Sequence, residues 1–293
     1  MRHKNSEEDL PEDLESCIAE LKSDRLYQSA AEQIENLLKF EYETKISALE
    51  EIDTSDVFID NTPSRIEKGD LLADFTKLKI RDSFLSDRIS EFFKIISKEN
   101  SEPVESLLPA VQSGGINFSL LQNALVNRGD YVSKLQQEFG IEPLVVISLF
   151  VSIYRPIFKA AIELNGKTFD LSHWKKSWCP FCGSLPCMSR LEKDTGKRYL
   201  WCMRCNSEWN FKRLECPFCA EEDTKYLDYF YLEDGSPYRV DVCRSCNAYL
   251  KTIDEKKSAS ERVFFLVEDT KTSYLDMLAV NEGFHKIIKG YKQ

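Results

Sequence analysis

The sequence predicts an α+β protein of several domains: an all-α N-terminal domain, two tandem four-cysteine modules of the rubredoxin or zinc-ribbon type, and a C-terminal helix. Apolar residues recur at helical spacing through the first half of the 293-residue chain. Eight of the ten cysteines then form four C-x-x-C pairs, with short aromatic, strand-like runs between them. We therefore divide the chain into a helical domain with an acidic N-terminal tail at 1–171, a first four-cysteine module at 172–214, and a second module with the C-terminal helix at 215–293.

In the helical domain, polar residues, Gly and Pro separate the predicted helices. The first helical region covers 15–52, and a break with Pro and Gly follows at 61–70. The second covers 71–99, and after breaks at "SEP" and "QSGGIN" two further helices are expected at 119–140 and 142–166. Gly140 and Gly166 suit the helix C-caps, and Pro156 is expected to kink or interrupt the last helix.

After residue 172 the pattern changes to short strands between cysteine pairs and turn residues. The runs "RYLWC" (198–202), "YLDYFYL" (226–232) and "YRVDVC" (238–243) are typical of strands. Residues 261–267 are interpreted as a short strand or a lead-in. A helix is expected around 270–282, with Gly283 as its C-cap.

The composition is that of a folded protein, with 42% hydrophobic and 12% aromatic residues. The most apolar stretch, 143–154, is too short to cross a bilayer and is interpreted as part of a buried helix, so no membrane partner is expected. The first residues contain no apolar signal-peptide core. We therefore expect a cytoplasmic location, where thiols stay reduced and C-x-x-C pairs bind metal more often than they form disulfides.

Charge is distributed unevenly along the chain. Residues 1–171 carry 19 basic and 31 acidic side chains, whereas residues 172–293 carry 20 and 18. A surface that binds nucleic acid needs an excess of basic groups to displace counterions from phosphates. The acidic first half and the nearly neutral second half therefore argue against DNA or RNA as the main partner.

The cysteine pairs repeat as two similar halves. "CPFCGSLP…GKRYLWCMRC" and "CPFCAEED…YRVDVCRSC" both begin with CPFC and end with C-x-x-C, and 19 and 23 residues separate the pairs. Each half has the spacing of a four-thiolate metal site. A module of this size also gains folding energy from a metal, so the sites can be structural whatever the function.

The residue after each C-x-x-C pair supports metal binding over dithiol catalysis. A C-x-x-C pair that binds metal lies in a tight turn called a knuckle. The residue after this turn often needs a positive φ, which Gly and Asn tolerate best. Gly183, Asn206 and Asn247 fit this requirement, and Ala220 is the exception.

Other candidate ligands are less suited to these sites. The three histidines are His3, His173 and His285, and only His173 lies close to a pair in sequence. Cys17 and Cys187 are interpreted as packed or exposed thiols outside the sites. Four thiolates suit either Zn²⁺ or a single iron, and no residue separates these two metals.

The order and flanks of these motifs resemble the formate dehydrogenase accessory protein family FdhE. The resemblance rests on "CPFCGSLP" (179–186), "RYLWCMRCNSEW" (198–209), "RLECPFC" (213–219) and "CRSCNAYLK" (243–251), and more loosely on "VEDTKTSYLDMLA" (267–279). Cys187, Ala220 and the altered acidic stretch depart from the family pattern. The chain also resembles this family in having a helical N-terminal half.

The resemblance implies a cytoplasmic maturation factor and not an enzyme. Such a protein binds the catalytic subunit of a respiratory formate dehydrogenase and supports its assembly or activation before twin-arginine export. It carries two rubredoxin-like sites, with iron more expected than zinc. The implied ligands of one metal are Cys179, Cys182, Cys202 and Cys205, and those of the other are Cys216, Cys219, Cys243 and Cys246.

The resemblance also places five residues beside the knuckles. Trp209, Tyr249 and Leu250 are expected to pack there, and Glu208 and Lys251 are expected to form surface ion pairs.

Two other functions stay open from the sequence. The C-x-x-C pairs could act as a dithiol oxidoreductase on a client protein, which requires thiols of low pKa. The modules could instead bind nucleic acid in the manner of zinc ribbons. The chain has no phosphate-binding loop, no G-x-S-x-G elbow and no H-E-x-x-H motif. The oligomeric state is not predicted.

Overall fold

The computed structural model describes residues 10–23, 27, 30–59, 63–97, 101–127, 130–165, 169–258 and 263–287. The helices are α1 (Glu12–Ser23), α2 (Ala31–Glu51), α3 (Pro63–Lys68), α4 (Asp82–Ile96), α5 (Ser101–Gln112), α6 (Phe118–Asn127), α7 (Tyr131–Phe139), α8 (Pro143–Asn165), α9 (Phe265–Lys271) and α10 (Ser273–Asn281), with a 3₁₀ turn η1 at Phe75–Lys77. The strands are β1 (Ile52–Asp53), β2 (Lys79–Ile80), β3 (Met188–Leu191), β4 (Arg198–Trp201), β5 (Glu208–Phe211), β6 (Leu227–Phe230), β7 (Tyr238–Cys243) and β8 (Ala248–Asp254).

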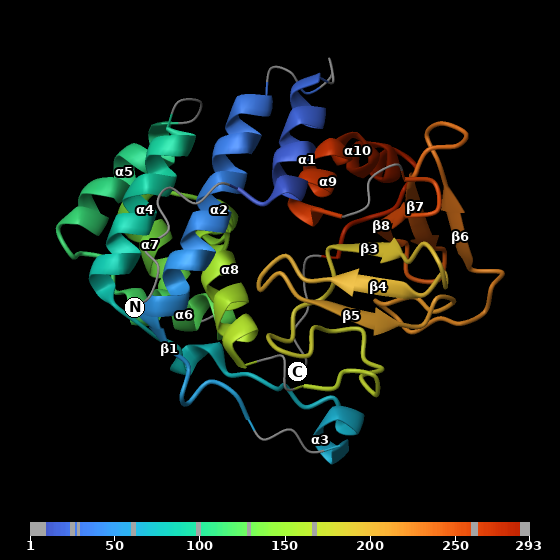
Figure 1. Cartoon of the computed structure of the whole chain (residues 1–293), viewed down its shortest axis with the longest axis horizontal. Helices are drawn as coiled ribbons and strands as arrows, with labels where there is room; N and C mark the ends of the chain where they lie inside the picture. Colours follow the sequence, from blue (N-terminus) through green and yellow to red (C-terminus); the bar gives the residue numbers. More distant parts are fainter. Residues whose placement is uncertain are drawn as a thin grey trace.

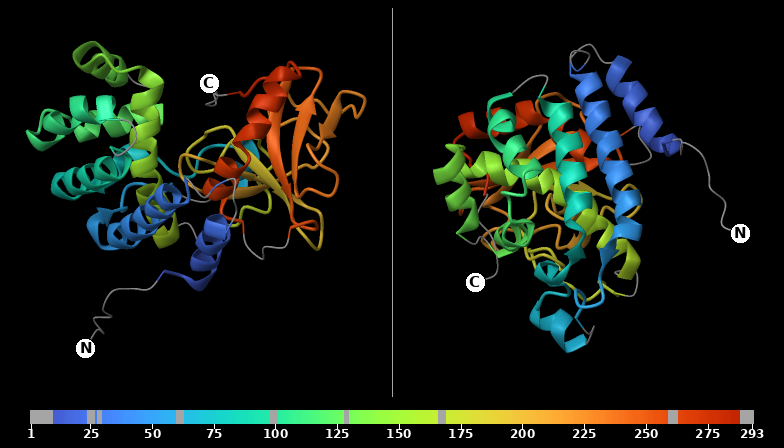
Figure 2. Two further views of the ribbon diagram at one scale, coloured as in Figure 1. Left: turned by 90° about the horizontal axis from the view of Figure 1, so that it is seen from above. Right: turned by 90° about the vertical axis from the view of Figure 1, so that its left-hand side faces the viewer.

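Helices and sheet occupy opposite sides of the molecule. Figure 1 shows α2 and α4–α8 on one side and the strands β3–β8 on the other, with α9 and α10 between α1 and the sheet. The view from above in Figure 2 shows the same division. The mixed fold, with a helical N-terminal half and two cysteine groups in the C-terminal half, confirms the predicted fold class.

The helical half has more helices than the periodicity predicted. The region 15–52 contains two helices, α1 and α2, and the region 119–140 contains α6 and α7. The prediction was wrong at 61–70, where α3 lies in the expected break, and at 101–112, where "SEP" begins α5. It was also wrong at 71–80, which holds η1 and β2 and not helix. Apolar period alone does not show where short polar turns interrupt a helix.

The long helix α8 is the central element of the helical core. It continues through Pro156 to Asn165, whereas the predicted C-cap Gly166 lies outside the described residues. Its length and apolarity would suffice to cross a membrane, but 61% of its most apolar window is buried inside the protein. Phe75 and Phe158 stack in this core with ring centroids 4.4 Å apart. The apolar run thus lies in a buried helix, as predicted, and the helix is not interrupted at Pro156.

Six strands of the described residues form one sheet in the order β5-β4-β3-β8-β7-β6. Neighbouring strands are antiparallel except β3 and β8, which are parallel with Met188 opposite Lys251. This parallel pair joins the two predicted modules, because β3–β5 belong to the first and β6–β8 to the second. The predicted boundary at 214/215 falls in the segment between β5 and β6.

The C-terminal helices cover the strands of the second module. Contrary to the expected strand or lead-in at 261–267, the short helix α9 begins at Phe265. Trp201 of β4 stacks on Phe265 with centroids 5.0 Å apart. The helix α10 confirms the prediction around 270–282, and Gly283 follows it with a φ of 88°.

Candidate metal centres

The cysteine pairs lie in tight turns that share one hydrogen-bond pattern. In the first knuckle Cys179 N–H donates to Ser184 O over 2.8 Å, and Gly183 N–H donates to Cys179 O over 3.0 Å. The knuckles that start at Cys202 and Cys216 repeat both bonds at the equivalent positions. This pattern turns the chain back within five residues, so both sulfurs of a pair face the same side.

The fourth knuckle, in which Cys243 pairs with Ala248 across β7 and β8, is also held by the C-terminal segment. His285 N–H donates to Asn247 O over 2.8 Å, and Tyr249 N–H donates to His285 O over 3.2 Å. The backbone of residue 285, after α10, therefore fixes this turn. Sequence reasoning did not place His285 here, because its backbone and not its imidazole makes the contacts.

All four residues that follow the pairs have left-handed backbone conformations. Gly183 has a φ of 72°, Asn206 of 54° and Asn247 of 55°, as the sequence predicted. Ala220 has a φ of 59° although its Cβ makes this conformation unfavourable. The turn geometry therefore overrides the preference of the residue in the third knuckle.

The structure brings the eight predicted cysteines together in two groups of four. The first cysteine site consists of Cys179, Cys182, Cys202 and Cys205, and the second of Cys216, Cys219, Cys243 and Cys246. Within each site the sulfurs all lie within 4.8 Å of one another. The closest sulfurs come from facing knuckles, 3.4 Å apart in the first site and 3.7 Å apart in the second.

These separations fit a tetrahedral ion. A tetrahedron with metal–sulfur bonds of about 2.3 Å has sulfur–sulfur edges of about 3.8 Å. Burial raises the pKa of the Cys179 and Cys205 thiols well above the usual value, so thiolates here need a cation to compensate their charge. A divalent ion would supply that charge. The donor set suits zinc and iron equally.

Polar groups hold the sulfurs of both sites. In the first site the Cys182 thiol donates to Ser184 Oγ at 3.3 Å, and Cys205 Sγ lies 3.1 Å from Ser207 Oγ. In the second site Phe218 N–H donates to Cys216 Sγ at 3.4 Å. Burial raises the pKa of Cys216, whereas at Cys219 hydrogen bonds from Glu221 N–H and the neighbouring thiols outweigh burial and lower the pKa.

The two other cysteines lie apart from the sites. Cys17 is buried in α1, and burial raises its pKa to about 11. Cys187 precedes β3, and burial raises its pKa to about 12. Neither belongs to a metal-binding group of the described residues, which agrees with their interpretation as packed thiols.

The residues expected beside the knuckles are mostly where the sequence predicted. Trp209, Tyr249 and Leu250 are at most 3% exposed and pack as expected. Glu208 forms the expected surface ion pair, 2.6 Å from Arg190.

The prediction for Lys251 was wrong. This lysine is 1% exposed, and its Nζ lies 2.7 Å from carboxylate oxygens of both Asp269 and Asp276. Tyr249 O–H donates to Asp276 over 2.7 Å. The residues form a buried clasp between β8 and the C-terminal helices, which the acidic residues at 269 and 276 complete.

Comparison with known proteins agrees with this arrangement. The family model "FdhE, central domain" matches residues 178–213, which include the whole first cysteine site. The chain is 26% identical to the FdhE homolog of Proteus mirabilis (strain HI4320) over 275 residues, 88% of this chain and 85% of that one. It is 29% identical to the FdhE homolog of Haemophilus influenzae (strain PittGG) over 218 residues, 71% of this chain and 67% of that one.

The chain is similar to FdhE proteins over most of its length. An FdhE homolog of Aquifex aeolicus (strain VF5) is 29% identical over 157 residues, a segment that spans only 54% of that protein. The crystal structure of the FdhE protein from Pseudomonas aeruginosa has the same fold, with a TM-score of 0.59 and 17% identity. That likeness covers 94% of this chain and 93% of the FdhE structure, so it includes the helical half.

Proposed function

We propose that this FdhE-like chain is a cytoplasmic accessory factor for a respiratory formate dehydrogenase. It binds the catalytic subunit and supports its assembly or activation before twin-arginine export, without catalysing a reaction itself. The observation that carries the proposal is the pair of four-cysteine sites in a chain similar to FdhE proteins. Location, client and export route follow from the family resemblance.

The shape and charge of the helical half support a role in protein binding. The 12 more acidic than basic side chains of residues 1–171 give this half a field that steers a basic partner toward it. The sheet and the first cysteine site pack against this half in one core, which presents the helices as a rigid surface.

We propose iron in preference to zinc at both sites. Cys179, Cys182, Cys202 and Cys205 would hold one ion, and Cys216, Cys219, Cys243 and Cys246 the other. The donor set fits both metals, so the preference rests on the family resemblance. Iron would add a one-electron couple to the protein, whereas zinc would only stabilise the fold.

Anaerobic co-purification tests the proposal. The tagged chain is expressed with the formate dehydrogenase catalytic subunit of the same cell, and the eluate is assayed for the subunit, iron and zinc. We expect capture of the subunit with about two iron ions per chain, one for each four-thiolate site. Capture of no subunit would contradict the client, and two zinc ions would contradict the metal.

A pair of cysteine variants controls this experiment. Cys17→Ser changes a buried thiol outside both sites and should leave capture and metal content unchanged. Cys216→Ser removes a buried ligand of the second site and should lower the metal content to about one ion per chain. If the C-x-x-C pairs were instead a dithiol oxidoreductase, their thiols would have to be free of metal in order to exchange. The unmodified chain would then carry no tightly bound metal, and Cys216→Ser would not change the metal content.

A further inference from the structure

The two cysteine sites differ most in how far solvent reaches their sulfur ligands. Each cysteine of the first site is at most 2% exposed. In the second site Cys216 and Cys243 are 4% and 3% exposed, whereas Cys219 is exposed and Cys246 is half-buried. Each knuckle of the second site therefore has an inner thiol, its first cysteine, and an outer thiol, its second.

Core packing follows the same division. The first-site cysteines belong to the largest hydrophobic cluster, together with residues of the helical half such as Leu72 and Phe158. The second-site cysteines belong to none of the four clusters formed by the described residues. We expect an ion to leave the first site only when the shared core opens, whereas two sulfur ligands of the second site already reach solvent.

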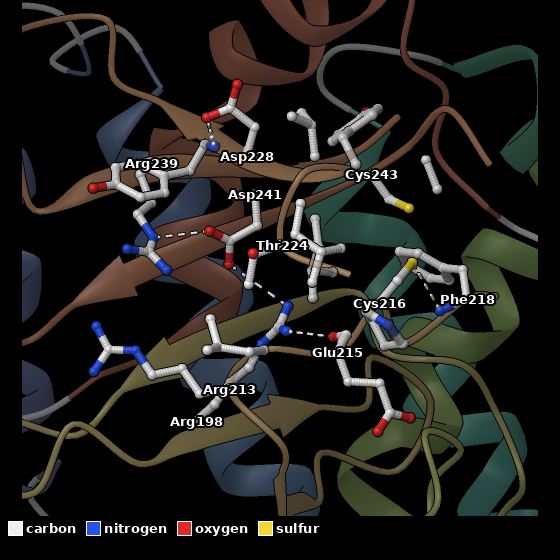
Figure 3. Close-up of a pocket in the computed structure, with 18 residues that line it drawn as sticks. Arg198, Arg213, Glu215, Cys216, Phe218, Thr224, Asp228, Arg239, Asp241 and Cys243 are labelled. Atoms are coloured by element: carbon white, nitrogen blue, oxygen red, sulfur yellow. Dashed lines mark hydrogen bonds and ion pairs between the residues drawn. The ribbon is translucent and has the colours of Figure 1, made fainter. Parts of the chain in front are cut away.

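A cavity lined by charged residues lies next to the two inner thiols, Cys216 and Cys243. Its volume is about 200 Å³, and Figure 3 shows Arg239 and Asp241 at its opposite side. Arg198, which is 4% exposed, donates to Glu215 O over 3.1 Å and lies 3.6 Å from Asp241. Arg239 lies 2.9 Å from the same carboxylate.

One carboxylate, that of Asp241, thus faces two buried guanidinium groups, and the whole lining of the cavity carries three arginines and three carboxylates. The outer thiols lie away from these groups. The second site therefore has a fixed inner half and a solvent-exposed outer half.

We propose that the second cysteine site is an exchange site, whose ion accepts an external thiolate in place of Cys219. This inference rests on the metal-binding part of the proposed function and is independent of the client's identity. A thiolate is the incoming ligand that the site favours, because it matches the softness of the ligand it replaces. The first site keeps its ion and serves as the structural centre.

The exchange step conserves charge and electrons. With an ion held by the four cysteines, the sulfur of an incoming thiol would take the ligand position that Cys219 Sγ gives up. The proton of the incoming thiol passes through solvent to Cys219, which leaves as a neutral thiol. No electron would be transferred, and the number of sulfur ligands and the net charge of the site would stay the same.

Metal-release kinetics test the proposal. The full chain is loaded with zinc, which is redox-silent, and a coloured zinc chelator is added with increasing N-acetylcysteine. We expect two phases of one ion each, with rates about a hundredfold apart because the first site must open the core. The rate of the fast phase should rise with the thiol concentration, and that of the slow phase should not.

Alkylation during release assigns each phase to a site. Iodoacetamide quenching and peptide mass spectrometry should find Cys219 and Cys246 modified with the fast phase, and the first-site cysteines only with the slow phase. Release of both ions in one phase, a fast phase without thiol dependence, or early modification of first-site cysteines would overturn the proposal. A chain that binds fewer than two zinc ions would overturn it together with the proposed metal sites.

Matched variants separate the sites further. Cys219→Ser and Cys182→Ser each replace the second cysteine of a knuckle. Cys219→Ser should abolish the thiol dependence of the fast phase and leave the slow phase unchanged. Cys182→Ser should remove the slow phase, and because loss of a core ligand can prevent folding, the alkylation pattern of the unmodified chain decides the assignment. The client capture experiment can fail without altering any of these outcomes.

Discussion

Ala220 holds a left-handed conformation that its side chain disfavours. Its φ of 59° equals that of the Gly and Asn residues at the other three knuckles within about 15°. An L-residue with a Cβ loses about 1 to 2 kcal/mol in this region, which Gly avoids. We expect Ala220→Gly to stabilise the metal-loaded chain by about 1 kcal/mol after the larger entropy of unfolded Gly is subtracted.

Zinc competition titration measures this gain as about fivefold tighter binding at the second site. Asn247→Gly is the matched control at the equivalent position of the fourth knuckle, where Asn already tolerates the conformation. Asn247→Gly should leave the zinc affinity of the second site almost unchanged. Equal gains from both variants would contradict the explanation based on the alanine Cβ.

Lys251 contributes to stability through a buried charge cluster. Among the described residues, its replacement by Met leaves Asp269 and Asp276 with the more distant Lys286 as their cation, 3.9 Å and 3.3 Å away. Removal of one partner from a buried ion pair is strongly destabilising, so we expect Lys251→Met to lower the free energy of unfolding by about 3 kcal/mol. Denaturant titration of the metal-loaded chain measures the loss.

Lys225→Met is the control for this variant. Lys225 pairs with Asp223 at 2.7 Å, but its side chain is 63% exposed. Exposed pairs contribute at most about 1 kcal/mol, so this change should be nearly neutral. Similar losses from both lysines would show that burial of Lys251 is not the cause.

At the scale of elements, the attachment of α9 and α10 to β8 depends on an ionised carboxylate. Burial by itself raises the pKa of Asp276, but the hydrogen bond from Lys251 and the charge of Lys286 outweigh burial and hold it below the usual value. A lowered pKa contributes stability that is present above the unfolded pKa of about 3.9 and is lost as pH falls through the folded value.

We therefore expect Asp276→Asn to cost about 2 kcal/mol at pH 7. This difference from the unmodified chain should shrink below a pH of about 4, where Asp276 becomes protonated in the unfolded chain, and should be lost as pH falls through the lower pKa of the folded chain. Because acid also releases metal from thiolates, the measured quantity is the difference between two chains treated alike. A difference that stays constant from pH 7 to pH 3 would contradict the role of the charge.

The sequence predicted the type of most elements better than their ends. Helical period identified α2, α4 and α8, and aromatic runs identified β4, β6 and β7. The strand β8 escaped because its polar residues, such as Lys251 and Thr252, are buried by partners distant in sequence. Local pattern cannot indicate that a lysine is buried when its carboxylates lie 18 and 25 residues later.

At the scale of the whole molecule, a close contact at Gly69 connects the helical half to the first cysteine site. Gly69 follows α3 with a φ of 76°, and an added Cβ would lie 2.6 Å from Lys176 and 2.8 Å from the rigid ring of Trp178. Trp178 Nε1–H also donates to Gly69 O over 3.2 Å. We expect Gly69→Ala to destabilise the chain by about 3 kcal/mol through backbone strain and this clash.

Gly140→Ala is the matched control for this interface. Gly140 has a similar φ of 69°, but an added Cβ would meet no atom within 4 Å. It should cost only the strain of about 1 kcal/mol. Denaturant titration with tryptophan fluorescence measures both, and equal losses would contradict a tight contact between the two halves.

The sequence predicted which cysteines form each ligand set, but it did not predict the sheet that joins the two sites or how far each site is exposed to solvent. C-x-x-C spacing and duplication specified which cysteines gather, because each knuckle is a local turn. The joining of both modules into one sheet depends on the β3–β8 pair, whose strands are separated by most of the second module. The unequal exposure of Cys182 and Cys219 follows from packing against the helical half, which equal motifs cannot reveal.

The parallel pairing of β3 with β8 also sets an order for biosynthesis. Strand β3 ends at residue 191 and β8 at residue 254, so 63 further residues must be translated before β3 can gain its second neighbour. At 5 to 20 residues per second this takes about 3 to 13 s. During that time the nascent chain on the ribosome exposes the β3 edge that β8 later covers. The later-made strand β8 therefore protects the middle of the chain from aberrant pairing with other nascent chains.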